Sequence, residues 1–234
     1  MKLKTLPDQA ADNALYLGTA AHTGIQESTT AMVENYYSNY YIIDDKHVNE
    51  LIKLEYLIPK VRALLPDGVA EVEINCEEYI GYIDWLVEVE PNVYDIYDFK
   101  YSNNVDNYLK SAQLHLYKYY FEKCNPTKRI RNLYFVFIPK TQIRQKKTED
   151  LYQFRKRLIE TLESMEISHK KCIKQVTYDE SSVQLFIKDK LDCLKSITFE
   201  RKKTKLCDWC QYKNYCHSDG SIDYDIIYPE VNHD

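Results

Sequence analysis

The segment YDIYDFKYSNN, residues 94–104, places two aspartates and a lysine among Tyr, Ile and Phe, which are residues that favour β-strands. Successive side chains of a strand alternate between its two faces. Asp98 and Lys100 therefore lie on one face, about 6–7 Å apart along the strand, while Asp95 lies on the other. A carboxylate and an ammonium group project together from this strand.

Two further segments with period-two alternation precede this one, GVAEVEINC at 68–76 and EYIGYIDWLVEVE at 78–90. Short polar connections join the three segments, which is typical of an antiparallel meander. The continuous apolar run RNLYFVFIP at 131–139 predicts an added strand covered on both faces. KKCIKQVTY at 170–178 predicts another short strand.

Apolar residues recur near helical spacing in the regions 12–40, 48–66, 105–123, 148–165 and 180–196. Pro59 is expected to break or end the second of these helices. The order helix, three strands, helix, strand, helix predicts an α/β fold in which helices flank a mixed β-sheet.

The overall composition narrows the classes of protein. A chain of 234 residues can bury one well-packed core, so we expect a single domain, residues 1–216, and an acidic C-terminal tail, 217–234. The net charge of −5 argues against non-specific coating of nucleic acid, although clusters such as ERKKTK permit a local basic groove. No apolar run is long enough to span a membrane. The N-terminus lacks the apolar core of a secretory signal, which predicts a cytoplasmic protein of a bacterial cell or phage-infected host.

Asp84 lies in the strand that precedes the Asp98 strand along the chain. Neighbouring strands are about 4.8 Å apart, so Asp84 and Asp98 could share a divalent cation if the register aligns them. Carboxylate oxygens suit Mg²⁺ or Mn²⁺. Lys100 could then orient an attacking water or neutralise charge on a phosphate. The alternative is that both aspartates are exposed polar positions of an ordinary sheet.

Two helical segments carry polar residues that could reach the same place. Gln113 and Tyr117 are four residues apart and share one helical face, where they could hydrogen-bond a phosphate or Lys100. His22 lies in a helix that could cap the site, and Gly18, one turn earlier, would allow close approach of the backbone. A lone histidine is more often structural or solvated.

Four motifs follow one another along the chain: G-x-x-x-H (Gly18, His22), G-x-I-D (Gly81, Asp84), D-x-K (Asp98, Lys100) and Q-L-x-x-Y (Gln113, Tyr117). Their order, which is more specific than any one motif, resembles the PD-(D/E)XK nuclease superfamily, and most of all its branch of RecB-type and CRISPR-associated exonucleases. The resemblance covers residues 16–216, most of the chain. It implies a restriction-endonuclease-like core.

The resemblance also implies a metal site. His22, Asp84 and Asp98 would be metal ligands, and the backbone carbonyl of Phe99 would complete the protein shell. The bound ion would be Mg²⁺ or Mn²⁺, and the reaction would be phosphodiester hydrolysis by a metal-activated water.

Lys100 would be the catalytic lysine of such a site, with Gln113 and Tyr117 positioning it and the DNA backbone. Glu73, on the strand before Asp84, is a lesser candidate that could hold a second-shell water. Glu71 shares its face, and the sequence does not separate the two.

The segment CDWCQYKNYC, residues 207–216, gives Cys207, Cys210 and Cys216 the spacing C-x2-C-x5-C. This spacing is a strong signal for a metal site, because such thiolates can surround one soft metal centre. In the RecB-type branch, three such cysteines join one near the N-terminus to hold a 4Fe-4S cluster. The alternative is three free thiols near a loop.

The fourth ligand of the cysteine motif is open, because no cysteine precedes Cys76. An upstream segment could supply it, or His217 could complete a Cys3His zinc site, or Cys193 could contribute. With seven cysteines and no secretory signal, we expect metal binding or free thiols rather than a disulfide framework. Cys76, Cys124 and Cys172 are accordingly expected to be buried or incidental.

The function expected from these features is a Mg²⁺- or Mn²⁺-dependent deoxyribonuclease, in particular an exonuclease acting in recombination, repair or phage DNA processing. Its partners would be DNA, as single strands or duplex ends, and recombination or replication proteins. Tyr36, Tyr37, Tyr119 and Tyr120 are loose candidates for a channel that stacks bases. The alternatives are a non-catalytic DNA-end-binding protein with the same fold and a metal-stapled adaptor protein.

Overall fold

The structure is a computed structural model that describes residues 9–197, 203–204, 206–207, 210 and 213–217. Gln9–Lys188 forms one compact unit, and the residues from Asp189 onwards belong to a second. The first unit contains the sheet and most of the helices, and it carries all of the motifs predicted for catalysis.

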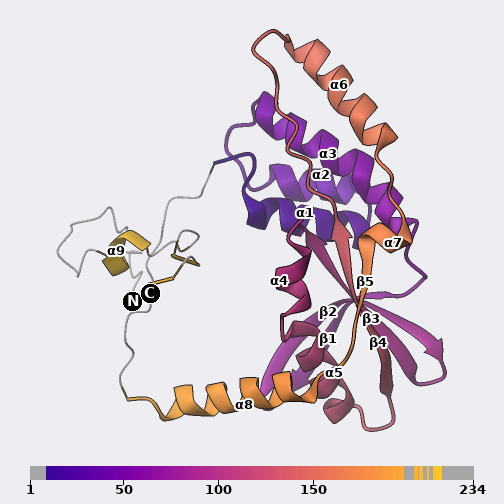
Figure 1. Ribbon diagram of the computed structural model, residues 1–234, viewed down its shortest axis with the longest axis vertical. Helices are drawn as coiled ribbons and strands as arrows, with labels where there is room; N and C mark the ends of the chain where they lie inside the picture. Colours follow the sequence, from indigo (N-terminus) through magenta and orange to yellow (C-terminus); the bar gives the residue numbers. More distant parts are fainter. Residues whose placement is uncertain (1–8, 198–202, 205, 208–209, 211–212, 218–234) are drawn as a thin grey trace, which may run out of the picture. The chain divides into compact units, whose positions relative to one another are not determined.

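A five-stranded mixed sheet forms the centre of the first unit, with its strands in the order in which they occur along the chain (Figure 1). The first three strands form an antiparallel meander, the fourth adds parallel to the third, and the fifth is antiparallel to the fourth. The strands are β1 (Val69–Cys76), β2 (Tyr79–Glu90), β3 (Val93–Tyr101), β4 (Arg129–Ile138) and β5 (Ile173–Val176). The predicted α/β class, with a meander and an added strand, is confirmed.

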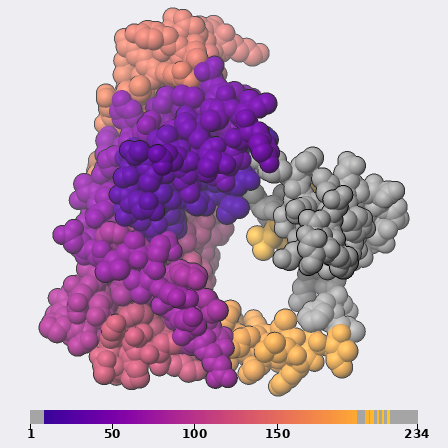
Figure 2. All heavy atoms as spheres, turned by 180° about the vertical axis from the view of Figure 1, so that it is seen from behind, coloured from indigo at the N-terminus to yellow at the C-terminus, as the bar shows by residue number. Residues whose placement is uncertain are grey.

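Helices cover both faces of this sheet. On one face lie α1 (Ala14–Gln26), α2 (Thr29–Tyr37) and α3 (Asp45–Arg62), and α6 (Leu151–Ser164) packs on α3. When the molecule is seen from behind, α1, α2 and α3 lie between α6 and the strands (Figure 2). The other face is covered by α4 (Val105–Leu109), α5 (Gln113–Cys124) and the first part of α8 (Glu180–Lys195). The short helix α7 (His169–Cys172) leads into β5, and α9 (Lys213–His217) belongs to the second unit.

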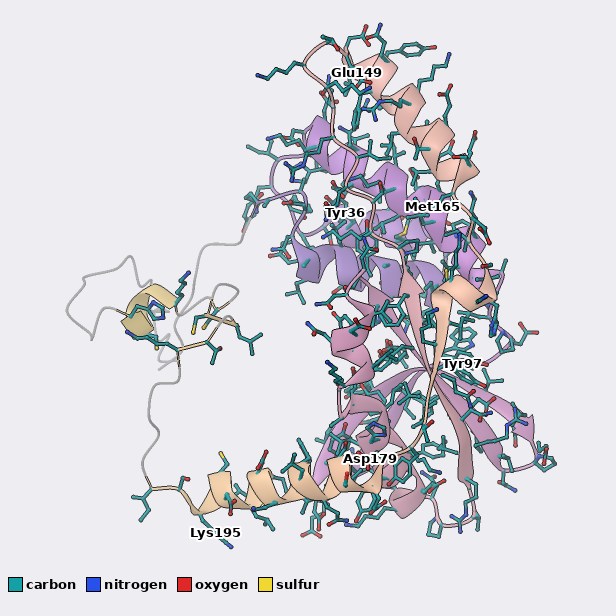
Figure 3. The ribbon with its side chains drawn as sticks, in the orientation of Figure 1. Tyr36, Tyr97, Glu149, Met165, Asp179 and Lys195 are labelled. Carbon is teal, nitrogen blue, oxygen red and sulfur yellow. A yellow bond between two sulfur atoms is a disulfide. The ribbon has the colours of Figure 1, made fainter. Side chains whose placement is uncertain are left out.

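Each face of the sheet has its own hydrophobic core. Phe99 of β3 belongs to the core that also includes Tyr36 of α2, which Figure 3 labels, whereas Ile96 belongs to the core that includes the buried side of α5. This alternation along β3 directs Asp98 and Lys100 to the face that α5 covers. The prediction that both residues share one face is confirmed.

The helix boundaries differ from the prediction in three places. Residues 12–40 contain two helices rather than one, and the region 105–123 is divided between α4 and α5. At the second break, the Ser111 hydroxyl accepts a hydrogen bond from the backbone N–H of Gln113 at 3.2 Å, which favours a new helix start. The helix was predicted to break or end near Pro59; α3 is not broken at this residue and ends three residues later, at Arg62. Buried side chains on both sides of Pro59, among them Ile58 and Val61, offset the cost of a proline within a helix, about 3 kcal/mol.

The expectation for two of the cysteines is also corrected. Cys76 at the end of β1 and Cys124 at the end of α5 form a disulfide, with their Cα atoms 6.2 Å apart. Their sequence separation of 48 residues gave no sign of this proximity, which arises because α5 packs across β1. Cys172 is buried, as expected.

Within the described residues, no helix combines the length and the apolarity needed to cross a membrane. The predicted acidic tail lies outside the described residues, apart from His217 at its start.

Candidate metal and catalytic site

The candidate site lies where β2 and β3 separate. Their pairing ends at Trp85 and Tyr97. Beyond this point β2 continues on β1 as far as Tyr79, and β3 continues on β4 as far as Tyr101. Asp84 and Asp98 are the next residues on the two diverging strands, one position beyond the last pair of the register.

The backbone N–H and C=O groups of Phe99 on β3 have no partner on β2 at this separation, and two side chains bond them instead. The carboxylate of Asp84 accepts a hydrogen bond from the Phe99 N–H, with Oδ2 at 2.7 Å. His22 of α1 bonds through Nε2 to the Phe99 carbonyl oxygen at 2.9 Å. The other ring nitrogen of His22, Nδ1, lies 3.5 Å from Oδ1 of Asp84. Buried backbone groups need such partners, which places both side chains firmly.

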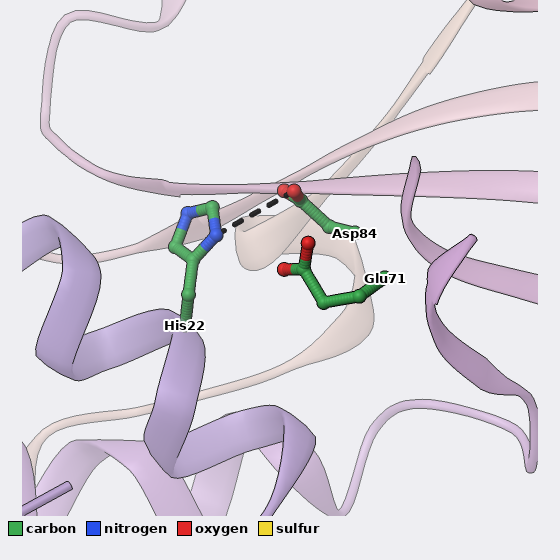
Figure 4. Close-up of side chains that lie close together, drawn as sticks. All are labelled: His22, Glu71 and Asp84. Carbon is green, nitrogen blue, oxygen red and sulfur yellow. Dashed lines mark ion pairs between the residues drawn. The ribbon is translucent and has the colours of Figure 1, made fainter. Parts of the chain in front are cut away.

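Glu71 of β1 completes a group with His22 and Asp84, in which the potential ligand atoms all lie within 4.8 Å of one another (Figure 4). The backbone of Glu71 has a φ of 50°, in the left-handed region that side-chain-bearing residues seldom adopt. This local turn accompanies a switch of faces on β1, because Ala70 packs with one core and Val72 with the other. Gln26 of α1 donates to Glu71 Oε1 at 2.6 Å and to the Asp84 carbonyl oxygen at 3.2 Å.

Asp98 and Lys100 lie beside this group, on the side of the sheet that α5 covers. Asp98 is fully buried, and its Oδ2 forms an ion pair with Lys100 Nζ. Its Oδ1 accepts no hydrogen bond within the described part of the chain. Lys100 Nζ also lies 5.5 Å from the ring centroid of Tyr108 and 5.7 Å from that of Phe135. A buried carboxylate with so few partners is costly unless a cation is nearby.

The charges of the site shift two pKa values. Burial, together with the nearby charge of Asp84, raises the pKa of Asp98 to about 7, against the opposite effects of Lys100 and His22. Burial by itself lowers the pKa of His22, but Asp84, Asp98 and the Phe99 carbonyl outweigh it, so the pKa of His22 is raised overall. Without a bound cation, the site therefore retains protons that a metal would displace.

The residues predicted from the fourth motif lie at the N-terminal end of α5. Gln113 donates from Nε2 to the hydroxyl of Tyr117 at 2.9 Å. Both residues line a groove of about 670 Å³ that also includes Asp84. Burial, with the charges of Asp98 and Asp84, raises the pKa of Tyr117 despite the opposing bond from Gln113. Tyr117 is thus held as a neutral hydroxyl next to the two aspartates.

The structure brings together most of the residues that the sequence singled out. His22, Asp84 and the Phe99 carbonyl meet at the separation of β2 and β3, with Asp98 and Lys100 adjoining. The roles assigned to these residues remain predictions.

Other residues fit the site less well or differently than expected. Both glutamates that the sequence left undecided are exposed, but Glu71 joins the group, whereas Glu73 lies outside it and accepts a hydrogen bond from Asn75. A Cβ atom at Gly18 would meet no atom within 4 Å in the described structure, so packing inside the protein does not require this glycine. Gln26 was missed, although its position four residues after His22 on one helix could have pointed to it.

The tyrosines suggested for a base-stacking channel do not line the groove beside Asp84. Tyr36 and Tyr120 are fully buried, so they cannot stack on a substrate. Tyr37 and Tyr119 are half-buried elsewhere. These four candidates are therefore not supported.

The donor set suits a hard divalent cation. The group itself offers two carboxylates, from Glu71 and Asp84, and the imidazole of His22, with Asp98 and the Phe99 carbonyl close by, and oxygen-rich surroundings of this kind favour Mg²⁺ or Mn²⁺. The buried Asp98 oxygen without a hydrogen bond offers a further point of attachment.

The raised pKa of Asp98 predicts an unusual pH dependence for the metal-free protein. The folded protein keeps the Asp98 proton up to pH of about 7, whereas the unfolded chain loses it near its ordinary pKa of 3.8. Because the folded state then binds more protons, the free energy of unfolding should fall as the pH rises between these values. When it is measured by denaturant unfolding in EDTA across this pH range, the free energy of unfolding should fall less steeply for Asp98→Asn than for the parent protein. Equal slopes for parent and variant would contradict the assigned pKa.

The comparison with known families agrees with this geometry. The family model of the PD-(D/E)XK nuclease superfamily matches residues 1–217. Neither a curated protein nor a solved structure matches the chain. Because the family match extends over nearly the whole length, the chain belongs to the PD-(D/E)XK nuclease superfamily.

Proposed function

We propose that the protein is a metal-dependent nuclease that hydrolyses phosphodiester bonds in DNA. The observation that carries this proposal is the convergence of His22, Glu71 and Asp84 beside the buried Asp98–Lys100 pair. Membership of a nuclease superfamily supports the reaction class. The site geometry supports the use of a divalent cation.

His22, Glu71, Asp84 and Asp98, with the Phe99 carbonyl, are the residues that would hold Mg²⁺ or Mn²⁺. When bound, the cation supplies a Lewis acid that polarises the phosphate and lowers the pKa of a water. Asp84 is held by the Phe99 N–H, so its second oxygen, Oδ1, is already directed towards His22 and the site. Such preorganisation reduces the rearrangement needed for binding.

Lys100 is placed to act on the phosphate itself. Its ammonium group lies against Asp98 and between the Tyr108 and Phe135 rings, where water is largely excluded. A positive charge in such surroundings stabilises the negative charge that grows on a phosphate during hydrolysis. Lys100 would also hold the attacking water by a hydrogen bond.

Gln113 and Tyr117 would position the DNA backbone. Their mutual hydrogen bond fixes both side chains on one turn of α5, facing the groove that includes Asp84. The Tyr117 hydroxyl remains a hydrogen-bond donor because its pKa is raised. A phosphate next to the scissile one is the expected acceptor.

The finer parts of this proposal follow the resemblance to the RecB-type branch. We propose an exonuclease that acts in recombination, repair or phage DNA processing in the cytoplasm, together with recombination or replication proteins. The order of the four motifs along the chain supports this narrower assignment.

We further propose that Cys207, Cys210 and Cys216 hold a 4Fe-4S cluster or a zinc ion, with His217 as a candidate fourth ligand. The spacing of the cysteines supports this. The sulfur of Cys207 accepts a hydrogen bond from the Thr204 N–H at 3.3 Å, and bonds of this type stabilise a thiolate.

The nuclease proposal predicts that Asp98→Asn and Lys100→Ala each slow hydrolysis of linear DNA in Mn²⁺ by about 100- to 1,000-fold, since each removes a charge that acts on the metal or the phosphate. Asp189→Asn, a change at a carboxylate of the second unit, is the control and should leave the rate unchanged. The readout is the release of labelled nucleotides. Digestion by both site variants at the parent rate would refute the proposal.

The choice of Glu71 over Glu73 predicts different metal requirements for two matched variants. Glu71→Gln should raise the Mn²⁺ concentration for half-maximal activity by about 10- to 100-fold, because a charged oxygen near the ion is lost. Glu73→Gln, an equally exposed glutamate on the same strand but outside the group of potential ligands, should not change it. Titration of activity with Mn²⁺ distinguishes them, and identical titration curves would exclude Glu71 from the metal site.

The cysteine proposal predicts a bound metal in protein purified without oxygen. A 4Fe-4S cluster should give a brown protein with visible absorption that is lost in Cys210→Ser. A colourless protein with one zinc per chain would favour the Cys3His site instead. A protein with neither iron nor zinc would overturn both versions.

A further inference from the structure

Gln26 of α1 connects two strands of the sheet at the candidate metal site. Its side-chain amide donates to Oε1 of Glu71 on β1 at 2.6 Å and to the backbone carbonyl oxygen of Asp84 on β2 at 3.2 Å. A side-chain amide nitrogen carries two hydrogens, so these two bonds use both of them. One of the bonds reaches a potential metal ligand, the Glu71 carboxylate.

The pairing of β1 with β2 is interrupted at the residues that Gln26 bonds. The register pairs the residues on either side of Glu71 and Asp84, but these two residues are not a pair of it. Both strands also change faces here. The flanking residues that pack with the core of the helical layer are Ala70 and Trp85, and those that pack with the other core are Val72 and Ile83. Backbone groups at such an irregularity need other partners, and Gln26 bonds the Asp84 carbonyl.

The Glu71 carboxylate depends on Gln26 for its position. Glu71 is exposed, and its backbone has the left-handed φ of 50°. Its carboxylate points towards His22 and Asp84 (Figure 4). Among the described residues, Gln26 alone donates a hydrogen bond to this carboxylate. An exposed glutamate without a partner would move among several rotamers, because fixing its side chain costs about 1.5–2 kcal/mol of conformational entropy. The bond engages Oε1, so Oε2 can bind an ion.

The amide of Gln26 holds Glu71 without cancelling its charge. A lysine or arginine could also donate to the carboxylate, but its positive charge would neutralise Glu71 and repel a metal ion. Asp98 shows the contrast, because its partner at the site is the ammonium group of Lys100. With a neutral donor, the negative charge of Glu71 remains available to a cation.

We propose that Gln26 is a positioning residue that fixes Glu71 as a ligand of the divalent cation. The inference rests on the proposed metal-dependent function and adds to it a residue that acts through another. Gln26 bonds the carboxylate that would hold the ion. Its second bond, to the Asp84 carbonyl, ties the position of Glu71 to the strand that carries the other carboxylate of the group.

The test measures binding of Mn²⁺ alone by isothermal titration calorimetry, without DNA. Gln26→Met keeps the length of the side chain but lacks the donor. It should weaken Mn²⁺ binding by about 10- to 100-fold, the loss typical of a residue that orients a metal ligand. Gln26→Ala, which also lacks the donor, should give the same loss. Asn75→Ala is the matched control, since it removes the amide that bonds Glu73, a glutamate of β1 outside the ligand group, and it should bind Mn²⁺ like the parent.

A double variant separates positioning of Glu71 from a general effect on the fold. If Gln26 acts through Glu71, adding Gln26→Met to Glu71→Gln should weaken Mn²⁺ binding by less than about twofold, because the ligand that it orients is already lost. A role confined to the Asp84 carbonyl would give the same loss in both backgrounds. Equal losses in the two backgrounds, or parent-like binding by Gln26→Met and Gln26→Ala, would overturn the inference.

Failure of this inference can be told apart from failure of the proposed function, because Mn²⁺ binding is measured without hydrolysis. If the parent cuts DNA but the Gln26 variants bind Mn²⁺ like the parent, the inference alone is wrong. If the Gln26 variants lose affinity only when Glu71 is present but the parent cuts no DNA in Mn²⁺, the positioning role stands and the nuclease proposal is wrong.

Discussion

The separation of β2 from β3 after Trp85 and Tyr97 is the constraint on which the candidate site depends. A sheet that divides leaves buried backbone groups without partners, and such groups must be bonded in another way. Here Asp84 bonds the backbone N–H of Phe99, and His22 bonds its carbonyl oxygen. The side chains that compensate for the divided sheet are thus the same ones that would hold a cation. Because they stabilise the fold, they are fixed before any metal or DNA arrives.

The charges of the site are balanced only in part by the chain itself. Asp98 is fully buried, with Lys100 as its ion-pair partner, while Asp84 and Glu71 add further negative charge close by. Burial close to the negative charge of Asp84 favours the protonated acid, which is why the pKa of Asp98 is raised to about 7. A divalent cation would relieve this excess of negative charge. The same surroundings that make the site costly without metal would strengthen its electrostatic action on a phosphate.

A groove that is lined by Asp84 and otherwise by uncharged residues adjoins this charged centre. The centre offers carboxylates and an ammonium group, which suit a metal ion and a phosphate. The groove and the centre both lie along β2, because the edge that the separation from β3 exposes continues from Asp84 to Tyr79. One irregularity of the sheet therefore creates both the reactive centre and the surface beside it.

The sequence by itself determined the strands, the common face of Asp98 and Lys100, and the superfamily, since these depend on local periodicity and on the order of motifs. Tertiary structure alone decided between Glu71 and Glu73. Strand alternation cannot separate these two residues, because residues two positions apart are expected on the same face. The left-handed backbone at Glu71 and the switch of faces beside it made that choice. Tertiary packing likewise brought Cys76 to Cys124 and carried α3 past Pro59. Periodicity reports which way a side chain points within its own element, whereas the approach of two elements depends on how all of them pack.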